Sequence, residues 1–164
     1  MLILSTVFFV LINLVVSPFY LLIMVAPRRV ATQQVLKSVW PLLLPAFVHV
    51  AFIVAIMVYS HPNIIGIWQE LYIEHGMFGA TTVEFLSQLY GTHAEFAVLH
   101  GWVHIVVGDM FMTRWAYLDA LSRHLPSWMI SVVALLIGFT GPLGVLLYFG
   151  IRPFFPQKTA LNQP

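Results

Sequence analysis

Four long apolar runs, separated by more polar stretches, set the pattern of this chain. Each run holds about 20 residues or more, which is the length that an α-helix needs to cross the hydrocarbon core of a bilayer. The pattern predicts an all-α fold, namely a polytopic membrane protein built as a bundle of about four transmembrane helices. The expected spans cover residues 2–26, 39–59, 93–115 and 128–151.

The connection between the second and third runs, residues 60–92, is much longer than the other loops. It contains Glu70, Glu74 and Glu84 but no lysine or arginine. Within it, residues 64–72 interleave apolar and aromatic side chains, which is typical of a helix lying in the membrane interface. We therefore expect this connection on the non-cytoplasmic side, where it rests on the membrane surface or dips into the mouth of the bundle.

Composition supports a membrane protein and excludes several other classes. Of the 164 residues, 60% are hydrophobic and only 8% are charged, which an ordinary soluble domain does not show. The chain has no cysteine, so disulfides and thiolate chemistry are excluded. Because the formal net charge is +1 and no cluster of basic residues is present, nucleic acid is not a partner. We expect one membrane domain over residues 1–153 and a tail over residues 154–164, in a bilayer such as a bacterial inner or a photosynthetic membrane.

Basic residues predict the orientation of the bundle. Five of the seven lie at the end of the first and third runs or in the loops that follow them: Arg28, Arg29, Lys37, Arg114 and Arg123. Short loops rich in lysine and arginine stay on the cytoplasmic side of a membrane. Four spans would then put both ends of the chain on the other side, and the two remaining basic residues, Arg152 and Lys158, weaken this bias because they follow the fourth run.

Three histidines form one stripe on the third run. At about 100° per residue, His93, His100 and His104 lie within roughly 40° of one another, and Phe111 continues the stripe. His49 lies midway along the second run, so an antiparallel neighbour would bring it to the depth of His104. Imidazoles at one level can bind iron, zinc or copper, ligate a chlorophyll magnesium, or form hydrogen bonds with neighbouring backbone.

Asp109 lies on the other side of the same helix, on a stripe with Glu95 and Trp102 that repeats every seven residues. An aspartate at the centre of a span costs roughly 2.5–3.5 kcal/mol on insertion scales, so such residues usually line a site, a cavity or a helix contact. With imidazoles on one side and carboxylates on the other, neither side suits lipid, and we expect this helix to be the most enclosed one. Simpler roles for Asp109 are an ion pair with Arg114 or the capping of a neighbouring helix.

Three stretches of the chain carry a family resemblance. They are Pro18-Phe19-Tyr20 with Met24 and Ala26-Pro27; Trp102-x-His104 with Asp109-x-Phe111, Arg114, Trp115 and Asp119-Ala120; and Gly141-Pro142-x-Gly144 with Tyr148. Their order and spacing resemble the abscisic-acid-deficient-four-like family, the neoxanthin-synthase group, over most of the chain.

In plants this family is associated with the conversion of violaxanthin to neoxanthin in plastid membranes. The resemblance implies an integral membrane protein of carotenoid metabolism that binds a carotenoid or another apolar, lipid-soluble ligand. Isomerisation of an epoxide end group to an allene requires an acid and a base but no redox cofactor. We assign these catalytic roles to His104 and Asp109, and substrate contacts to Trp102, Phe111, His100 and His49. Because His104 and Asp109 point about 140° apart on one helix, at most one of them acts on the reacting atom.

Other functions are compatible with the same residues. A non-enzymatic pigment-binding or accessory subunit of a membrane complex would use the imidazoles to hold chlorophyll or carotenoid. A metal-dependent oxidation or cleavage of carotenoids would use His49, His100 and His104 as ligands, and His61 and His75 add to the histidines outside the family stretches. A purely structural protein would use its polar residues to fix helix packing. The favoured interpretation requires no cofactor; a bound carotenoid or metal ion, a homo-oligomer and a larger complex belong to the alternatives.

Overall fold

The computed structural model describes residues 2–75 and 94–157, and this part of the chain consists of helices joined by short turns, without strands. The predicted all-α class is therefore confirmed. The helices are α1 (Leu2–Val25), α2 (Val30–Lys37), α3 (Trp40–His75), α5 (Ala94–Ser122), α6 (Ser127–Thr140), α7 (Pro142–Ile151) and the short 3-10 helix η1 (Arg152–Phe154).

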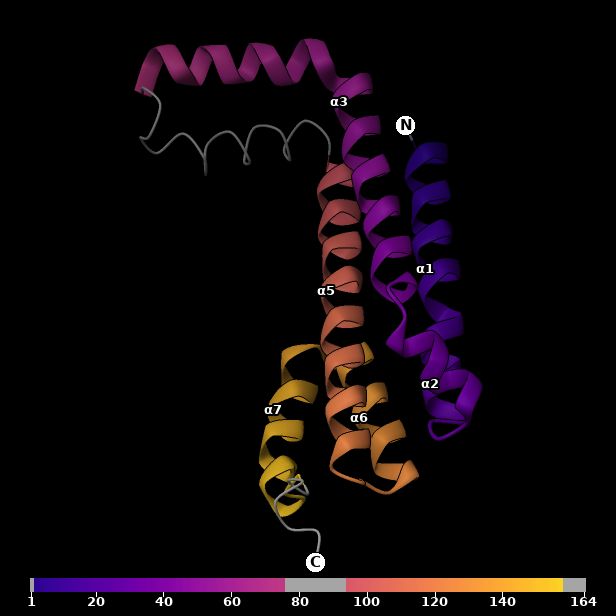
Figure 1. Cartoon of the computed structure of the whole chain (residues 1–164). Coiled ribbons are helices and arrows are strands. Elements are labelled where there is room, and N and C mark those ends of the chain that lie inside the picture. Colours follow the sequence, from indigo (N-terminus) through magenta and orange to yellow (C-terminus); the bar gives the residue numbers. More distant parts are fainter. Residues whose placement is uncertain (1, 76–93, 158–164) are drawn as a thin grey trace, which may run out of the picture.

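Three long helices form the body of the molecule. α1, the first part of α3 and α5 lie side by side, and α2 connects α1 to α3 at one end (Figure 1). The second part of α3 turns away from the other helices (Figure 1). It includes residues 64–72, so the helix expected there is confirmed, whereas its place at a membrane surface stays a prediction. Residues 76–92 of the expected connection lie outside the described residues.

The described residues contain one helix that is long and apolar enough to cross a membrane, Ser5–Val25 within α1. A second candidate arises if α2 and the first part of α3, Val30–Lys37 and Trp40–Ala55, count as one span bent by 48°. Large apolar side chains such as Leu14 and Phe47 stand exposed on these helices. Contiguous exposed apolar surface of this kind marks a surface that faces lipid or a partner rather than water.

Two apolar clusters hold the helices together. The first lies between α1, α3 and α5 and is centred on Ile12, Phe52 and Val103. The second lies between the end of α1, the second half of α5 and the α6–α7 pair, with Met110 and Ile137 at its centre. Burial of one large aliphatic or aromatic side chain contributes about 1.5–3 kcal/mol in water, but in a bilayer close packing rather than water exclusion holds helices together.

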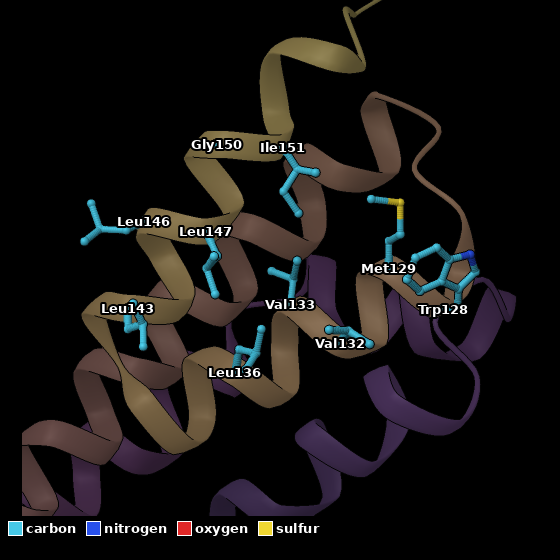
Figure 2. Close-up of a pocket in the computed structure, with 10 residues that line it drawn as sticks. All are labelled: Trp128, Met129, Val132, Val133, Leu136, Leu143, Leu146, Leu147, Gly150 and Ile151. Carbon is cyan, nitrogen blue, oxygen red and sulfur yellow. The ribbon is translucent and has the colours of Figure 1, made fainter.

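The fourth apolar run is not one helix. We expected an interrupted span over residues 128–151, and the structure has instead two short helices that fold back on each other (Figures 1 and 2). Gly141 lies between them with φ +53°, a left-handed conformation that glycine adopts without strain, and Pro142 then starts α7. The helices pack so closely that a Cβ on Gly144 would lie 2.4 Å from the backbone nitrogen of Ile137. With 14 and 10 residues, each is shorter than the about 20 residues needed to cross a bilayer.

The basic residues of the described chain lie at one end of the bundle, because the hairpin returns Arg152 to the end where the others lie. Arg28 donates a hydrogen bond to the carbonyl of Leu125, and Arg123 donates one to the carbonyl of Phe155. Those that lie at this end are Arg28, Arg29, Lys37, Arg114, Arg123 and Arg152. The expectation that residues following the fourth run lie at the opposite end was wrong, because the hairpin returns the chain to the end from which α6 begins.

Candidate functional site

Three of the predicted site histidines lie together between α3 and α5. The ring centroid of His49, on α3, is 5.5 Å from those of His100 and His104, on α5. The rings of His100 and His104 are 6.4 Å apart because the two residues are separated by one helical turn. His49 lies at the depth of His104 because the two helices pack antiparallel, as the positions of the two residues within their runs predicted. His93, the remaining histidine of the expected stripe, lies outside the described residues.

The histidine cluster has one enclosed member and one open member. Nε2 of His49 is buried without a hydrogen-bond partner among the described residues, and leaving a buried polar atom unpaired costs roughly 1–3 kcal/mol. His104 is exposed on the outer side of the cluster. In the described chain, no group of three histidine or acidic side chains is placed to hold a metal ion. The cluster is therefore a set of packed imidazoles in which, within the described part of the chain, Nε2 of His49 has no hydrogen-bond partner.

Asp109 lies away from the histidines, where α5 meets the tip of the α6–α7 hairpin. Its Oδ1 atom is 3.1 Å from the position that a Cβ on Gly141 would occupy, so the carboxyl group packs directly on the backbone of the turn. Gly141 also precedes the first turn of α7, and a helix N-terminus favours negative charge. Among the described residues, no ion pair or hydrogen bond involves the Asp109 side chain. Asp109 lies near this helix end without a hydrogen bond that would cap it, so the expected capping role is not confirmed.

Arg114 has other partners than Asp109. Its Nε donates a hydrogen bond of 2.8 Å to the carbonyl of Leu36, and its Nη2 reaches the carbonyls of Lys37 and Ser38. These carbonyls end α2 and have no partners within that helix, so the guanidinium stabilises the helix end. The expected ion pair between Asp109 and Arg114 was wrong because Arg114 is one and a half turns further along α5, opposite α2.

Tyr20, on α1, completes the polar centre around Asp109. Oγ1 of Thr113 donates a hydrogen bond of 3.3 Å to the Tyr20 hydroxyl oxygen, and Asp109 precedes Thr113 by one turn on the same side of α5. The ring lies against α6, where a Cβ on Gly138 would be 2.8 Å from its Cε1 atom. We name Tyr20, Asp109 and Thr113 with Gly141 the Asp109 centre. Sequence reasoning did not place Tyr20 in a site, and its only signal was its position in the first family stretch.

An aromatic surface extends from Asp109 along α5. Trp102 lies two turns away on the same side of the helix, about 10 Å along the axis, and its ring centroid is 5.7 Å from that of Phe9 on α1. Trp102 and Ile105 are exposed, because α6 and α7 lie beside only the second half of α5 (Figure 1). Of the predicted substrate-binding residues, Trp102 thus shares a face with Asp109, whereas His49 and His100 do not. Phe111 is exposed on the histidine side.

A third polar cluster fastens the hairpin at the basic end of the bundle. The carboxylate of Asp119 accepts hydrogen bonds from Tyr148 at 2.6 Å, Arg123 at 2.8 Å and Arg152 at 2.9 Å. Burial raises the pKa of Asp119, but these hydrogen bonds and the positive charge outweigh burial and hold the pKa at about 2. Arg152 also lies 5.8 Å from the ring centroid of Trp115. The cluster ties α7 to α5 and leaves Asp119 ionised.

A groove of about 520 Å³ runs between α6 and α7. Figure 2 shows its lining, which consists of aliphatic side chains with Met129 and Trp128 at one end. Among these lining side chains the indole N–H of Trp128 is the one polar group, and because none of them is an acid or a base, the groove is a less suitable reaction site than the Asp109 centre.

The model of one protein family, described as ABA DEFICIENT 4-like, matches residues 7–148 of the chain. The chain belongs to this family. The match begins in α1 and ends in α7, so it includes both the histidine cluster and the Asp109 centre. No curated protein and no solved structure matches the chain. Family membership and the apolar helix α1 together indicate a membrane protein linked to carotenoid metabolism.

Proposed function

We propose that this member of the ABA DEFICIENT 4-like family modifies one end group of a carotenoid by acid–base isomerisation within the membrane. The observation that carries the proposal is the convergence of the three family stretches. Tyr20 from the first stretch is hydrogen-bonded to Thr113, which follows Asp109 of the second stretch by one turn of α5. Asp109 in turn packs on Gly141 of the third stretch. Because these residues come from distant parts of the chain, their meeting supports a site built for a shared purpose.

The fold supports three membrane crossings and one partial insertion. In this topology α1, the first part of α3 and α5 cross the bilayer, and the α6–α7 hairpin enters it from the basic end. The positive-inside rule then places that end in the cytoplasm. This arrangement accounts for Arg152, whose position conflicted with four spans, because the hairpin returns it to Asp119 beside Arg123.

Cysteine labelling tests this topology directly, since the chain contains no cysteine. Single cysteines at positions 30, 122 and 157 should all react from the cytoplasmic side, and a cysteine at position 3 should react only from the other side. Four full spans predict instead that position 157 reacts together with position 3. Labelling of position 157 from the non-cytoplasmic side would contradict the hairpin as an insertion from the cytoplasmic end.

The Asp109 centre suits a ligand that is apolar along its length and oxygenated at its end. The end group would rest on the hairpin tip at Asp109, and the polyene would lie against Phe9 and Trp102 in contact with lipid. A C40 carotenoid is about as long as the ~30 Å hydrocarbon core is thick, so this small bundle can hold one end ring but cannot enclose the whole molecule. The geometry therefore favours chemistry on a single end ring.

One carboxyl group can perform both proton transfers of the isomerisation. In its protonated form, Asp109 would donate its proton to the epoxide oxygen as the carbon–oxygen bond breaks. The resulting carboxylate would then remove a proton from the adjacent polyene carbon, which forms the allene and restores the carboxylic acid. Atoms and electrons balance without a cofactor. His104 lies on another side of α5 and is not required for these steps, so of the two predicted catalytic residues we retain Asp109.

Expression in a carotenoid-producing host tests this function. We expect the pigment profile to change relative to an empty vector when the host makes epoxidised carotenoids, and Asp109→Asn to abolish the change. His124→Asn is a suitable control, because His124 is exposed in the α5–α6 turn with a positive φ that asparagine tolerates. An unchanged profile with cyclic, hydroxylated and epoxidised carotenoids would exclude the proposed function.

Nε2 of His49 has no hydrogen-bond partner among the described residues, which favours a second candidate function, non-enzymatic pigment binding. A bound pigment would supply the missing partner through a chlorophyll magnesium or a carotenoid oxygen. Absorption spectra of the gently purified protein would then show stoichiometric pigment that His49→Phe removes. Conversion of an added carotenoid distinguishes the first function from this one.

A further inference from the structure

The groove between α6 and α7 lies on a face of the hairpin that the other described helices leave open. Its volume is about 520 Å³, which is within the range of pockets that bind ligands. The lining includes three exposed leucines of α7, Leu143, Leu146 and Leu147. Along α6 the groove extends from Trp128 to Leu136, which is about 12 Å at the rise of an α-helix. It can therefore hold a stretch of one hydrocarbon chain.

The two ends of the groove differ in polarity. Figure 2 shows Leu136 and Leu143 toward one end, near the turn between the two helices, and Trp128 with Met129 at the other. The indole N–H of Trp128 is a hydrogen-bond donor, and this side chain is exposed. An elongated ligand in the groove would therefore contact aliphatic side chains along its length and would meet a donor at one end.

Arginine side chains flank the Trp128 end of the groove. Arg28 donates a hydrogen bond through Nη2 to the carbonyl of Leu125, which lies three residues before Trp128, and Arg28 itself is exposed. A guanidinium group carries several N–H donors, so this bond leaves others for a ligand. On the α7 side, Arg152 directly follows Ile151 of the groove lining. Positive charge thus lies at the same end as the indole N–H.

This end of the bundle has an excess of positive charge. The basic residues of the described chain lie there, whereas Asp119, the described acidic residue at this end, is bonded to Arg123 and Arg152. Basic residues on the cytoplasmic side of membrane helices attract anionic lipid headgroups, and arginine can bind two phosphate oxygens at once. The groove and its charged end together match a molecule that has a hydrocarbon chain and an anionic phosphate.

We propose that the groove binds one anionic phospholipid, with an acyl chain between α6 and α7 and the phosphate at Arg28 and the indole N–H of Trp128. Every bilayer lipid offers apolar chains to an apolar groove, so the groove determines where the lipid binds and the charge determines which headgroup is preferred. The proposal rests on the proposed topology, which places this end of the groove at the headgroups of the cytoplasmic leaflet, but not on carotenoid chemistry. The bound lipid stabilises the hairpin, because it binds the folded protein and not the unfolded chain.

Native mass spectrometry of the purified full-length protein in detergent tests the proposal without an activity assay. The probes are dioleoylphosphatidylglycerol and dioleoylphosphatidylcholine, which have the same acyl chains and differ in the net charge of the headgroup. Wild type should retain one phosphatidylglycerol per chain and bind it about fivefold more tightly than phosphatidylcholine, which is the effect of one arginine near an anionic headgroup. Equal affinity for the two lipids would overturn the proposal.

Thermal unfolding distinguishes a lipid from a free anion. Phosphatidylglycerol should raise the unfolding midpoint of the wild type more than phosphatidylcholine does, and inorganic phosphate alone should leave the midpoint unchanged. An equal rise with inorganic phosphate would overturn the proposal, because it would indicate a site for the anion without the acyl chain.

Gly150→Leu tests the place of the acyl chain. Gly150 lines the groove and has nothing within 4 Å of its Cβ position, so a leucine occupies the groove without a collision at Cβ, and we expect at least a tenfold loss of affinity for phosphatidylglycerol. Gly101→Leu on α5 is the matched control, because its Cβ position is equally open and lies outside the groove. If circular dichroism and gel filtration show that Gly150→Leu does not fold, Val132→Trp fills the groove from α6. Wild-type affinity in a folded filling variant would overturn the proposal.

Arg28→Gln tests the place of the phosphate. It removes the charge but keeps a donor for the carbonyl of Leu125, and the preference for phosphatidylglycerol should disappear, whereas Arg28→Lys should retain most of it. Arg29→Gln is the matched control, because it removes the same charge at the adjacent position and, within the described chain, the Leu125 carbonyl bonds to Arg28. An unchanged preference in Arg28→Gln, or an equal loss in Arg29→Gln, would overturn the proposal.

The same spectra identify other occupants of the groove. A dimer of this chain that Gly150→Leu dissociates, or a co-purified pigment that Gly150→Leu removes, would overturn the proposal in favour of that occupant. Lipid preference in a protein that converts no carotenoid would reject the proposed function and support the lipid site. Conversion of a carotenoid by a protein without lipid preference would reject the lipid site alone.

Discussion

The histidine cluster and the Asp109 centre lie on different sides of the same helix and are built in different ways. His49, His100 and His104 come from two adjacent antiparallel helices, and their contact needs only the correct depth of each. The Asp109 centre needs α1, α5 and the turn between α6 and α7 to meet at one point. A polar cluster between two helices can arise from simple packing, whereas a centre that depends on a chain reversal must be assembled by the whole fold. The second kind of site is the stronger candidate for a specific function.

The largest expected difference between the two regions is in catalysis. Asp109→Asn should lower carotenoid conversion at least a hundredfold, since general acid–base groups contribute about 10²–10⁴-fold. His104→Ala should retain activity within a few-fold, because its ring lies with His49 and not with the Asp109 centre. Pigment chromatography after expression in a carotenoid-producing host measures both. Equal losses in the two variants would show that the reaction uses both sides of α5.

Two glycines of α7 allow a test of how much the close packing of the hairpin contributes to stability. Gly144→Ala should destabilise the protein by about 1–3 kcal/mol or more, as overpacking does, because the new Cβ would lie 2.4 Å from the backbone of α6. Gly150→Ala is the matched control in the same helix, with nothing within 4 Å of its Cβ position. Thermal unfolding in detergent should show a lower midpoint for the first variant and an equal or higher one for the second. Similar midpoints would contradict the close α6–α7 packing on which the Asp109 centre depends.

The sequence predicts the histidine cluster better than the Asp109 centre, and the reason is physical. The separation of His104 from Asp109 and the stripe of His100 and His104 depend only on helical periodicity within one segment. The position of His49 adds only the depth of an adjacent helix. The turn at Gly141 is different, because a glycine–proline pair in a long apolar run is compatible with both a kinked span and a reversal. Only the packing of α7 on α6 distinguishes these two possibilities.

Tyr20 and Arg114 show the same limit of prediction from sequence, because their partners come from distant parts of the chain. The contact between Tyr20 and Thr113 joins residues more than 90 positions apart, and no local pattern on α1 indicates it. Arg114 is near enough to Asp109 in sequence to suggest an ion pair, but the end of α2 provides several unpaired carbonyl groups in a better direction. The closeness of two opposite charges along α5 therefore predicted Asp109 as the partner of Arg114, whereas in the folded protein Arg114 binds the carbonyl groups at the end of α2.

Asp119 permits a test of how firmly the hairpin is fastened, with a smaller expected effect that depends on pH. Its pKa of about 2 in the folded protein is below the ordinary value of about 3.9 for an unfolded chain. Its stabilisation is therefore fully present above about pH 4 and is lost as the pH falls from 4 toward 2. The midpoint of thermal unfolding should drop over this range in wild type. In Asp119→Asn it should already be lower at pH 7, and the drop attributable to Asp119 should be absent. An identical pH dependence in both proteins would contradict the ionised cluster.

The smallest expected effect is the change in the unfolding midpoint when His49 is replaced. The sign of this change distinguishes a structural cluster from a binding site. If nothing binds there, His49→Leu removes a buried nitrogen that has no partner among the described residues. Replacing such a group by an apolar one is nearly neutral or stabilising, so the unfolding midpoint should stay the same or rise by a few degrees, and carotenoid conversion should be retained. If the cluster holds a pigment, the bound ligand stabilises the wild type by mass action, and His49→Leu should lower the midpoint and lose the pigment absorption together. A lower midpoint in protein that never carried pigment would contradict both interpretations and would indicate that His49 has a structural partner.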